Sequence, residues 1–175
     1  MAILTKSFYI HVSEKVNEFS LKELLEMAIK AEIGVREFYK SMAANVDMES
    51  FKKKLKFLAE EERKHEILLR KLYAQTFPGE ELIFPKEQVG PELKPVASKL
   101  EKIQDIIDLV RWAMKSKDIA SKLYETLENM ADTEEKRRLM CSLSDMEKGH
   151  YYTLRAEYEL LLNWGMYSQM MRVGL

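Results

Sequence analysis

The strongest constraint on the fold is a pattern, E-x-x-H, that occurs twice in the sequence. Residues 62–65 and 147–150 both carry it, and the two copies lie 85 positions apart. The same offset aligns Tyr39 with Tyr124 and needs no gap. Other identical pairs at this offset are Leu24 with Leu109, Ala28 with Ala113, Lys30 with Lys115, Asp47 with Asp132, Leu58 with Leu143 and Leu69 with Leu154. The sequence therefore predicts two copies of one structural unit.

Each copy reads as two long helices, as expected for a chain with only 6 Gly and 4 Pro. In the first copy, Ser20 and Glu23 form a capping-box pattern that begins a helix ending near Asn45. Asp47 is expected to cap the next helix, which ends near Gln75.

The second copy repeats this order. Ser98 and Glu101 form another capping-box pattern at the start of a helix of similar length. Asp132 or Thr133 is expected to cap the fourth helix, which continues past Trp164.

The segment between the copies, Phe77 to Pro95, holds all four prolines and is a connector. A helix of ~25 residues is about 37 Å long, so the connector can run the length of a bundle. We therefore predict one all-α domain over residues 1–175, a four-helix bundle with a long crossover connection and a C-terminal helical extension. The first copy spans about 20–75, the connector about 76–97 and the second copy about 98–165.

Both E-x-x-H patterns lie within apolar stripes whose steps alternate four and three, which places each stripe on one helix face. The first stripe is Phe51, Leu55, Leu58, Glu62, His65, Leu69 and Leu72, and the second is Met140, Leu143, Glu147, His150 and Leu154. Carboxylate and imidazole groups one turn apart can bind the same metal, and together they suit iron, manganese or zinc. One such pattern is weak evidence because Glu and His are common on solvated faces, but two equivalent copies favour a shared metal site.

Glu32 interrupts another apolar stripe in the first predicted helix. The inward positions there are Ala28, Glu32, Val35, Tyr39 and Met42. Burying an isolated carboxylate is costly, and a bound metal would remove that cost. One Glu from each of two helices plus E-x-x-H from the other two is a known two-metal pattern. The alternative is a surface ion pair between Glu32 and Arg36.

The run A-I-K-A-E-x-x-x-x-E-F-Y from Ala28 to Tyr39, followed by E-R-K-H, resembles the rubrerythrin-like branch of the ferritin-like superfamily. The resemblance covers about Ser20 to Leu162. It implies a ferritin-like bundle, catalytic carboxylates and tyrosines that hydrogen-bond to the ligands. The implied metal ligands are Glu32, Glu62, His65, Glu147 and His150, with Glu32, Glu62 and Glu147 as the catalytic residues and Tyr39 and Tyr124 as the tyrosines.

Two features depart from the family pattern. Lys117 stands at the equivalent of Glu32, where family members usually have Glu, and Ala120 stands where some carry a further Glu. Full-length relatives also have a Cys-rich iron module that supplies electrons, whereas Cys141 is the single cysteine of this sequence. We read Cys141 as a small apolar residue near the core. These departures imply an external electron-donor protein.

Lys117 also bears on the number of metal ions. We expect its ammonium to pair with a carboxylate of the site; the alternatives are a stem that reaches solvent or a neutral amine that ligates. Asp118 would face inward only through a π-bulge. Three glutamates and one lysine sum to −2, so we expect one well-held ion and a second position that is weak or empty.

The leading functional hypothesis is an iron oxidoreductase that acts on peroxide or oxygen. The alternatives are non-catalytic iron binding or storage, and a structural bundle with a degenerate site. With 28 basic and 29 acidic residues and no long apolar run, we expect neither nucleic-acid nor membrane binding. One cysteine and no recognisable signal peptide suggest the cytoplasm. The Met-rich tail from Trp164 to Met171 suggests a homo-oligomer, a dimer or larger, and His11 is expected to be incidental.

Overall fold

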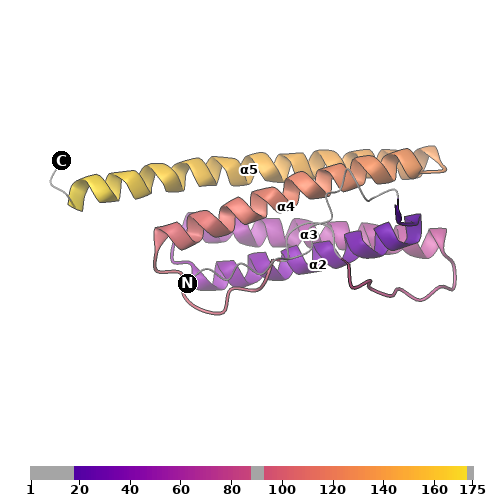
Figure 1. Ribbon diagram of the computed structural model, residues 1–175, viewed down its shortest axis with the longest axis horizontal. Coiled ribbons are helices and arrows are strands. Elements are labelled where there is room, and N and C mark those ends of the chain that lie inside the picture. Colours follow the sequence, from indigo (N-terminus) through magenta and orange to yellow (C-terminus); the bar gives the residue numbers. More distant parts are fainter. Residues whose placement is uncertain (1–17, 88–92, 173–175) are drawn as a thin grey trace.

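The computed structural model describes residues 18–87 and 93–172, which contain four helices and no strand (Figure 1). The helices are α2 (Leu21–Asn45), α3 (Glu49–Thr76), α4 (Ile103–Met130) and α5 (Glu134–Arg172). The predicted all-α class is therefore confirmed, and each sequence copy forms one helix pair.

Two of the predicted helix starts agree with the structure. The Ser20 hydroxyl accepts from the backbone N–H of Glu23 at 3.3 Å, and the Glu23 carboxylate accepts from the backbone N–H of Ser20 at 2.8 Å. This is the predicted capping box of α2. At the start of α5, the Thr133 hydroxyl accepts from the backbone N–H of Lys136 at 3.3 Å, so Thr133 rather than Asp132 provides the cap.

The other two predicted caps are wrong. Asp47 precedes the N-cap position of α3, which is Met48, and its carboxylate pairs with Lys99 at 2.8 Å. The Ser98 and Glu101 pattern does not begin α4 either, because the helix starts later, at Ile103. The reason lies in tertiary contacts, since the backbone N–H of Leu100 donates to the carbonyl of Asn45 at 2.9 Å and ties this segment to the end of α2.

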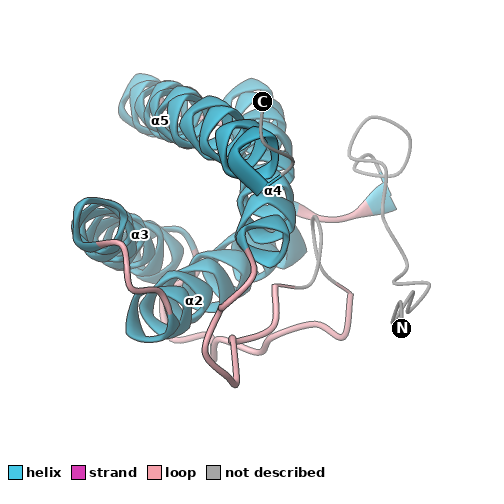
Figure 2. Ribbon diagram, turned by 90° about the vertical axis from the view of Figure 1, so that its left-hand side faces the viewer, coloured by secondary structure: helices cyan, strands magenta, loops and turns pink. Residues whose placement is uncertain are grey.

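The helices pack as two antiparallel pairs, α2 with α3 and α4 with α5 (Figures 1 and 2). The pairs meet through α2 against α4 and α3 against α5. Because the connector returns along the bundle, α3 and α4 run in the same direction (Figure 1). This is the predicted crossover topology.

The connector is fastened to α2 at several levels. The Lys30 ammonium donates to the carbonyl of Pro85 at 2.6 Å, near the middle of the bundle. Further along, the backbone N–H of Val96 donates to the Ser41 hydroxyl at 2.8 Å, and the Asn45 amide donates to the Val96 carbonyl at 3.0 Å. These bonds fasten the described parts of this connecting strap, on both sides of residues 88–92, to α2.

The core consists of two apolar clusters separated by a polar layer. One cluster includes Leu24, Leu25, Leu69, Leu72, Leu123, Leu127, Met140 and Leu143. The other includes Val35, Tyr39, Met42, Phe51, Leu55, Leu58, Val110 and Leu154. All residues of the three predicted inward stripes are buried, including their Glu and His members. The polar layer is therefore shielded by hydrocarbon on both sides along the bundle.

The prediction for Cys141 is wrong, because its side chain is exposed. Met140 is buried, and the next position on a helix points about 100° away from it.

The last turns of α5 project beyond the other three helices (Figure 1). With 39 residues, α5 is about 58 Å long at ~1.5 Å per residue. Trp164, Met166, Tyr167 and Met170 on this extension are exposed in the single chain. No helix in the described part of the chain combines the length and apolarity needed to cross a membrane.

Candidate metal centre

The polar layer between the two apolar clusters receives side chains from all four helices. They are Glu32 from α2, Glu62 and His65 from α3, Lys117 from α4, and Glu147 and His150 from α5. Every one of them is buried. The structure thus brings together the five ligands implied by the resemblance, and His11 lies outside the described residues.

His65 lies against three carboxylates from three helices. Its Nδ1 atom is 2.9 Å from Oε1 of Glu147, 3.4 Å from Oε2 of Glu62 and 3.7 Å from Oε1 of Glu32. His65 therefore faces a carboxylate of α2, of its own helix α3 and of α5.

His150 faces two carboxylates. Its Nδ1 atom is 3.5 Å from Oε1 of Glu62 and 3.8 Å from Oε1 of Glu147. The His65 and His150 rings are stacked, with centroids 5.5 Å apart. The two E-x-x-H motifs consequently face one another across the bundle at the same level.

Lys117 lies within the same layer, with a side chain that is only 1% exposed. Its Nζ atom is 2.8 Å from Oε2 of Glu62 and 2.7 Å from Oε2 of Glu147. The alternative in which the lysine reaches solvent is therefore excluded. α4 is regular here, and Asp118 pairs with Lys122 at 2.9 Å instead of facing the centre.

The two repeat-equivalent tyrosines have different surroundings. The Tyr124 hydroxyl, from α4, donates to Oε1 of Glu32 on α2. The hydroxyl of Tyr39 is buried and has no hydrogen-bond partner among the described residues. Glu32 does not pair with Arg36, which binds Glu37 and Glu66 instead.

The pKa values of the centre reflect a balance between burial and neighbouring charge. Burial disfavours the charged forms of Lys117 and His65, but the adjacent carboxylates outweigh it. The pKa of Lys117 is therefore well above its ordinary value, and that of His65 is raised to about 12. For His150, burial prevails over Glu62 and Glu147, and its pKa is lowered. In the metal-free centre, the carboxylates thus favour the cationic form of His65, whereas burial favours the neutral form of His150.

The donor atoms of this layer fit a metal ion. One ligand atom from each of Glu62, His65, Glu147 and His150 lies within 4.8 Å of the other three. Buried polar atoms normally have hydrogen-bond partners, yet several here have none among the described residues, although Lys117 lies at ion-pair distance. They include both oxygens of Glu62 and of Glu147, both nitrogens of His65, Nδ1 of His150 and Oε2 of Glu32. Atoms that converge without bonding to one another are what a metal requires.

A small gap between α2 and α4 adjoins the centre. Its volume is about 20 Å³, enough for one water molecule. Glu32, Lys117 and Tyr124 line it together with small residues that had no signal in the sequence, among them Ala31 and Ser116. Ala120, where some relatives carry a further carboxylate, also lines it. The small side chains thus leave room beside the buried carboxylates.

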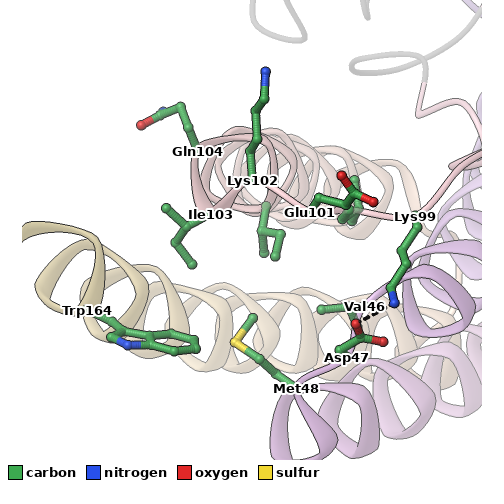
Figure 3. A pocket seen from close by; sticks show the side chains of 11 residues that line it. Val46, Asp47, Met48, Lys99, Glu101, Lys102, Ile103, Gln104 and Trp164 are labelled. Carbon is green, nitrogen blue, oxygen red and sulfur yellow. Dashed lines mark ion pairs between the residues drawn. The ribbon is translucent and has the colours of Figure 1, made fainter. Parts of the chain in front are cut away.

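A larger cavity of about 600 Å³ lies elsewhere, at the end of the bundle (Figure 3). It is bounded by the α2–α3 loop with the Asp47–Lys99 ion pair, by the start of α4, and by Trp164 of α5 (Figure 3). None of the buried centre residues lines it. The larger cavity and the buried polar centre are therefore separate regions of the molecule.

Comparison with known proteins agrees with this architecture. A solved structure of a hypothetical protein from Pyrococcus furiosus is 68% identical and covers 86% of this chain and 96% of its own, with a TM-score of 0.85. No curated protein was found to match. The family model described as Rubrerythrin matches residues 23–158, which include both helix pairs of the buried centre, and the chain belongs to the rubrerythrin family.

Proposed function

We propose that this chain binds iron at the buried centre and uses it to reduce peroxide or oxygen with electrons from a separate protein. The observation that supports this best is the set of buried, unpartnered ligand atoms on Glu62, His65, Glu147 and His150. Glu32 would complete the set from α2. Manganese or zinc would suit the same donors, but only iron or manganese would supply redox chemistry.

Bound iron would supply electrons to an oxygen–oxygen bond. The chain's own residues prepare the space for that chemistry. Tyr124 fixes one oxygen of Glu32, the two apolar clusters exclude bulk water, and the gap beside Ala120 leaves space for a molecule the size of water. Because the neighbouring carboxylates raise the pKa of His65 and favour its cationic form, ligation of a metal would release that proton.

The source of electrons must lie outside the sequence. Its single cysteine, Cys141, cannot form the Cys-rich iron module that would deliver electrons to the centre. An exposed thiol also suits a reducing compartment such as the cytoplasm. We therefore include an external electron-donor protein in the proposal.

Two other functions remain as alternatives. Non-catalytic iron binding or storage would use the same ligands without an electron donor. A structural bundle with a degenerate site is favoured by Lys117, because its ion pairs with Glu62 and Glu147 partly neutralise the carboxylates without any metal. Metal content separates the structural role from the other two, and peroxide turnover separates catalysis from storage.

The first test measures the thermal midpoint with and without added Fe(II) under anaerobic conditions. A ligand at 100 times its Kd stabilises the folded state by ~2.7 kcal/mol, so the parent protein should melt at a higher temperature with metal. The double variant His65→Ala, His150→Ala should lose this dependence, whereas His11→Ala, which removes the third histidine, should keep it.

An identical midpoint with and without metal in the parent protein would contradict metal binding. If binding is observed, peroxide consumption with a chemical reductant then distinguishes the oxidoreductase from storage. Iron that binds but leaves the rate of peroxide loss at the level of the double histidine variant would favour storage.

A further inference from the structure

We propose that Lys117 limits the centre to one metal ion, because its ammonium occupies the α4 side where a second ion would otherwise bind. This inference rests on the proposed function, namely that the centre binds metal. It concerns how many ions the residues of this chain can hold.

The internal repeat places Lys117 at the position where a two-metal centre would have its second glutamate. Such bundles take one glutamate from each of two helices in addition to the two E-x-x-H motifs. Here α2 supplies Glu32, whose Oε1 atom lies 3.7 Å from Nδ1 of His65. The equivalent position on α4 supplies a cation. Among the described residues, the carboxylates that face His150 are Glu62 of α3 and Glu147 of α5.

The ammonium also occupies one oxygen of each of the two carboxylates, Glu62 and Glu147, that would bridge a pair of ions. Oε2 of Glu147 lies 2.7 Å from Lys117, while its Oε1 lies 2.9 Å from His65 and 3.8 Å from His150. Oε2 of Glu62 lies 2.8 Å from Lys117, while its Oε1 lies 3.5 Å from His150. A bridging carboxylate needs one oxygen for each metal. With Oε2 held by the lysine, each glutamate has one oxygen left for a metal.

The size of the remaining ligand set matches a single ion. Ligand atoms on opposite sides of one ion, with bonds of about 2.1 Å, lie about 4.2 Å apart. The four ligand atoms of Glu62, His65, Glu147 and His150 lie within 4.8 Å of one another. A small inward shift of these side chains would therefore enclose one ion between both E-x-x-H motifs.

The charge of the layer leads to the same number. With both histidines neutral, as metal ligation requires, Glu32, Glu62 and Glu147 contribute −3 and Lys117 contributes +1. One divalent ion then neutralises the layer, and a second would leave +2 there. Uncompensated charge is expensive in a buried layer between apolar clusters. Lys117 does not reduce the excess positive charge by holding its ammonium in solvent, because its side chain is 1% exposed. Glu at position 117 would instead give −4, which two divalent ions balance.

The test loads Mn(II) anaerobically into the parent protein, Lys117→Glu and the control Lys115→Glu, and measures bound metal per folded chain. Lys115 is exposed on the same helix, so its replacement makes the same change in charge outside the centre. We expect one ion in the parent protein and in Lys115→Glu, and two in Lys117→Glu. Electron paramagnetic resonance should show isolated Mn(II) in the first two proteins and an exchange-coupled pair in the third.

Two ions in the parent protein would overturn this inference and leave the proposed function intact. A folded Lys117→Glu protein that still holds one ion would also overturn it. No bound metal in any of the three would refute the proposed function itself. Should Lys117→Glu fail to fold, the number of ions in the parent protein decides the matter by itself.

Discussion

The α2 and α4 sides of the buried centre occupy equivalent positions of the repeat and differ in charge. On α2, Glu32 accepts a hydrogen bond from Tyr124, which belongs to the other copy. On α4, Lys117 takes the place of a carboxylate, and Tyr39, the equivalent of Tyr124, has a buried hydroxyl with no bonding partner in the described ranges. One residue difference thus removes a ligand and also an acceptor. Glu32 and Lys117 thus occupy equivalent backbone positions in the two copies but carry opposite charges.

The two sides of the centre also differ in the interactions that stabilise the metal-free chain. Among the described residues, Lys117 is the one lysine or arginine that is buried, and it contacts Glu62 of α3 and Glu147 of α5. The α4 side is therefore stabilised by ion pairs within the metal-free chain. On the α2 side, Glu32 accepts a hydrogen bond from Tyr124 and lies 3.7 Å from Nδ1 of His65.

The largest effect on stability is expected from removing the buried ammonium of Lys117. Lys117→Met should lower the free energy of unfolding of the metal-free protein by about 3–5 kcal/mol, because Glu62 and Glu147 then lose the buried ammonium that pairs with both of them. Urea unfolding in the presence of a chelator measures this loss. Lys115→Met, on the exposed face of the same helix, should stay within about 0.5 kcal/mol of the parent protein. A loss below about 1 kcal/mol for Lys117→Met would mean that these ion pairs contribute little to folding.

Replacing Tyr39 or Tyr124 by Phe makes the same chemical change on each side of the centre, so the two losses of stability can be compared directly. Tyr124→Phe should cost about 2 kcal/mol, because it leaves a buried carboxylate without its donor. Tyr39→Phe should change stability by less than about 0.5 kcal/mol, because the hydroxyl it removes has no partner in the described chain.

The same urea experiment measures both tyrosine variants. Equal losses for Tyr39→Phe and Tyr124→Phe would show that the two halves are energetically alike despite Lys117. In a Lys117→Glu background, Tyr39→Phe should become costly as well, because the new carboxylate would accept from Tyr39.

The last difference between the two copies is the length of their second helices, α3 and α5. α5 has 39 residues and α3 has 28, and the part of α5 after Trp164 exposes Met166, Tyr167 and Met170. We propose that this extension packs against a second copy of the chain. Deletion from Gly165 onward should lower the oligomeric mass measured by light scattering and change the unfolding free energy of the separated chain by less than about 1 kcal/mol.

A matched control removes an exposed aromatic residue elsewhere. Phe57 on α3 is 59% exposed, close to the 62% of Tyr167, which the deletion removes. Phe57→Ser should leave the oligomeric mass unchanged. A deletion variant with the mass and melting curve of the parent protein would exclude the extension as an interface.

Much of this architecture could be predicted because it follows from periodicity. The stripes that contain Glu32, Glu62 and His150 identified buried faces, since helical spacing alone decides which side chains share a face. Local capping was less predictable. Ser20 caps α2 as expected, whereas the same S-x-x-E pattern at Ser98 does not begin a helix, because a tertiary bond from Leu100 to Asn45 holds that backbone.

The details of the centre depended on distances that no sequence pattern carries. The sequence led us to expect Lys117 to pair with one carboxylate, and the structure gives it two, on different helices. The unpartnered hydroxyl of Tyr39 could have been inferred from the offset that relates Glu32 to Lys117, had it been applied to the hydrogen bonds as well as to the ligands. Exposure of Cys141 could have been read from its place beside the stripe residue Met140.

The gap-free repeat has a consequence for how such a centre could arise. If two identical helix pairs associated as a symmetric dimer, the rotation axis would make every residue appear twice, so positions 32 and 117 would be the same amino acid. Such an assembly could place two anions or two cations at the centre, never one of each. In a single chain, by contrast, a substitution can alter one copy and leave the other unchanged. The strap between α3 and α4 thus does more than connect the halves: because it joins the two copies in one chain, positions 32 and 117 can differ.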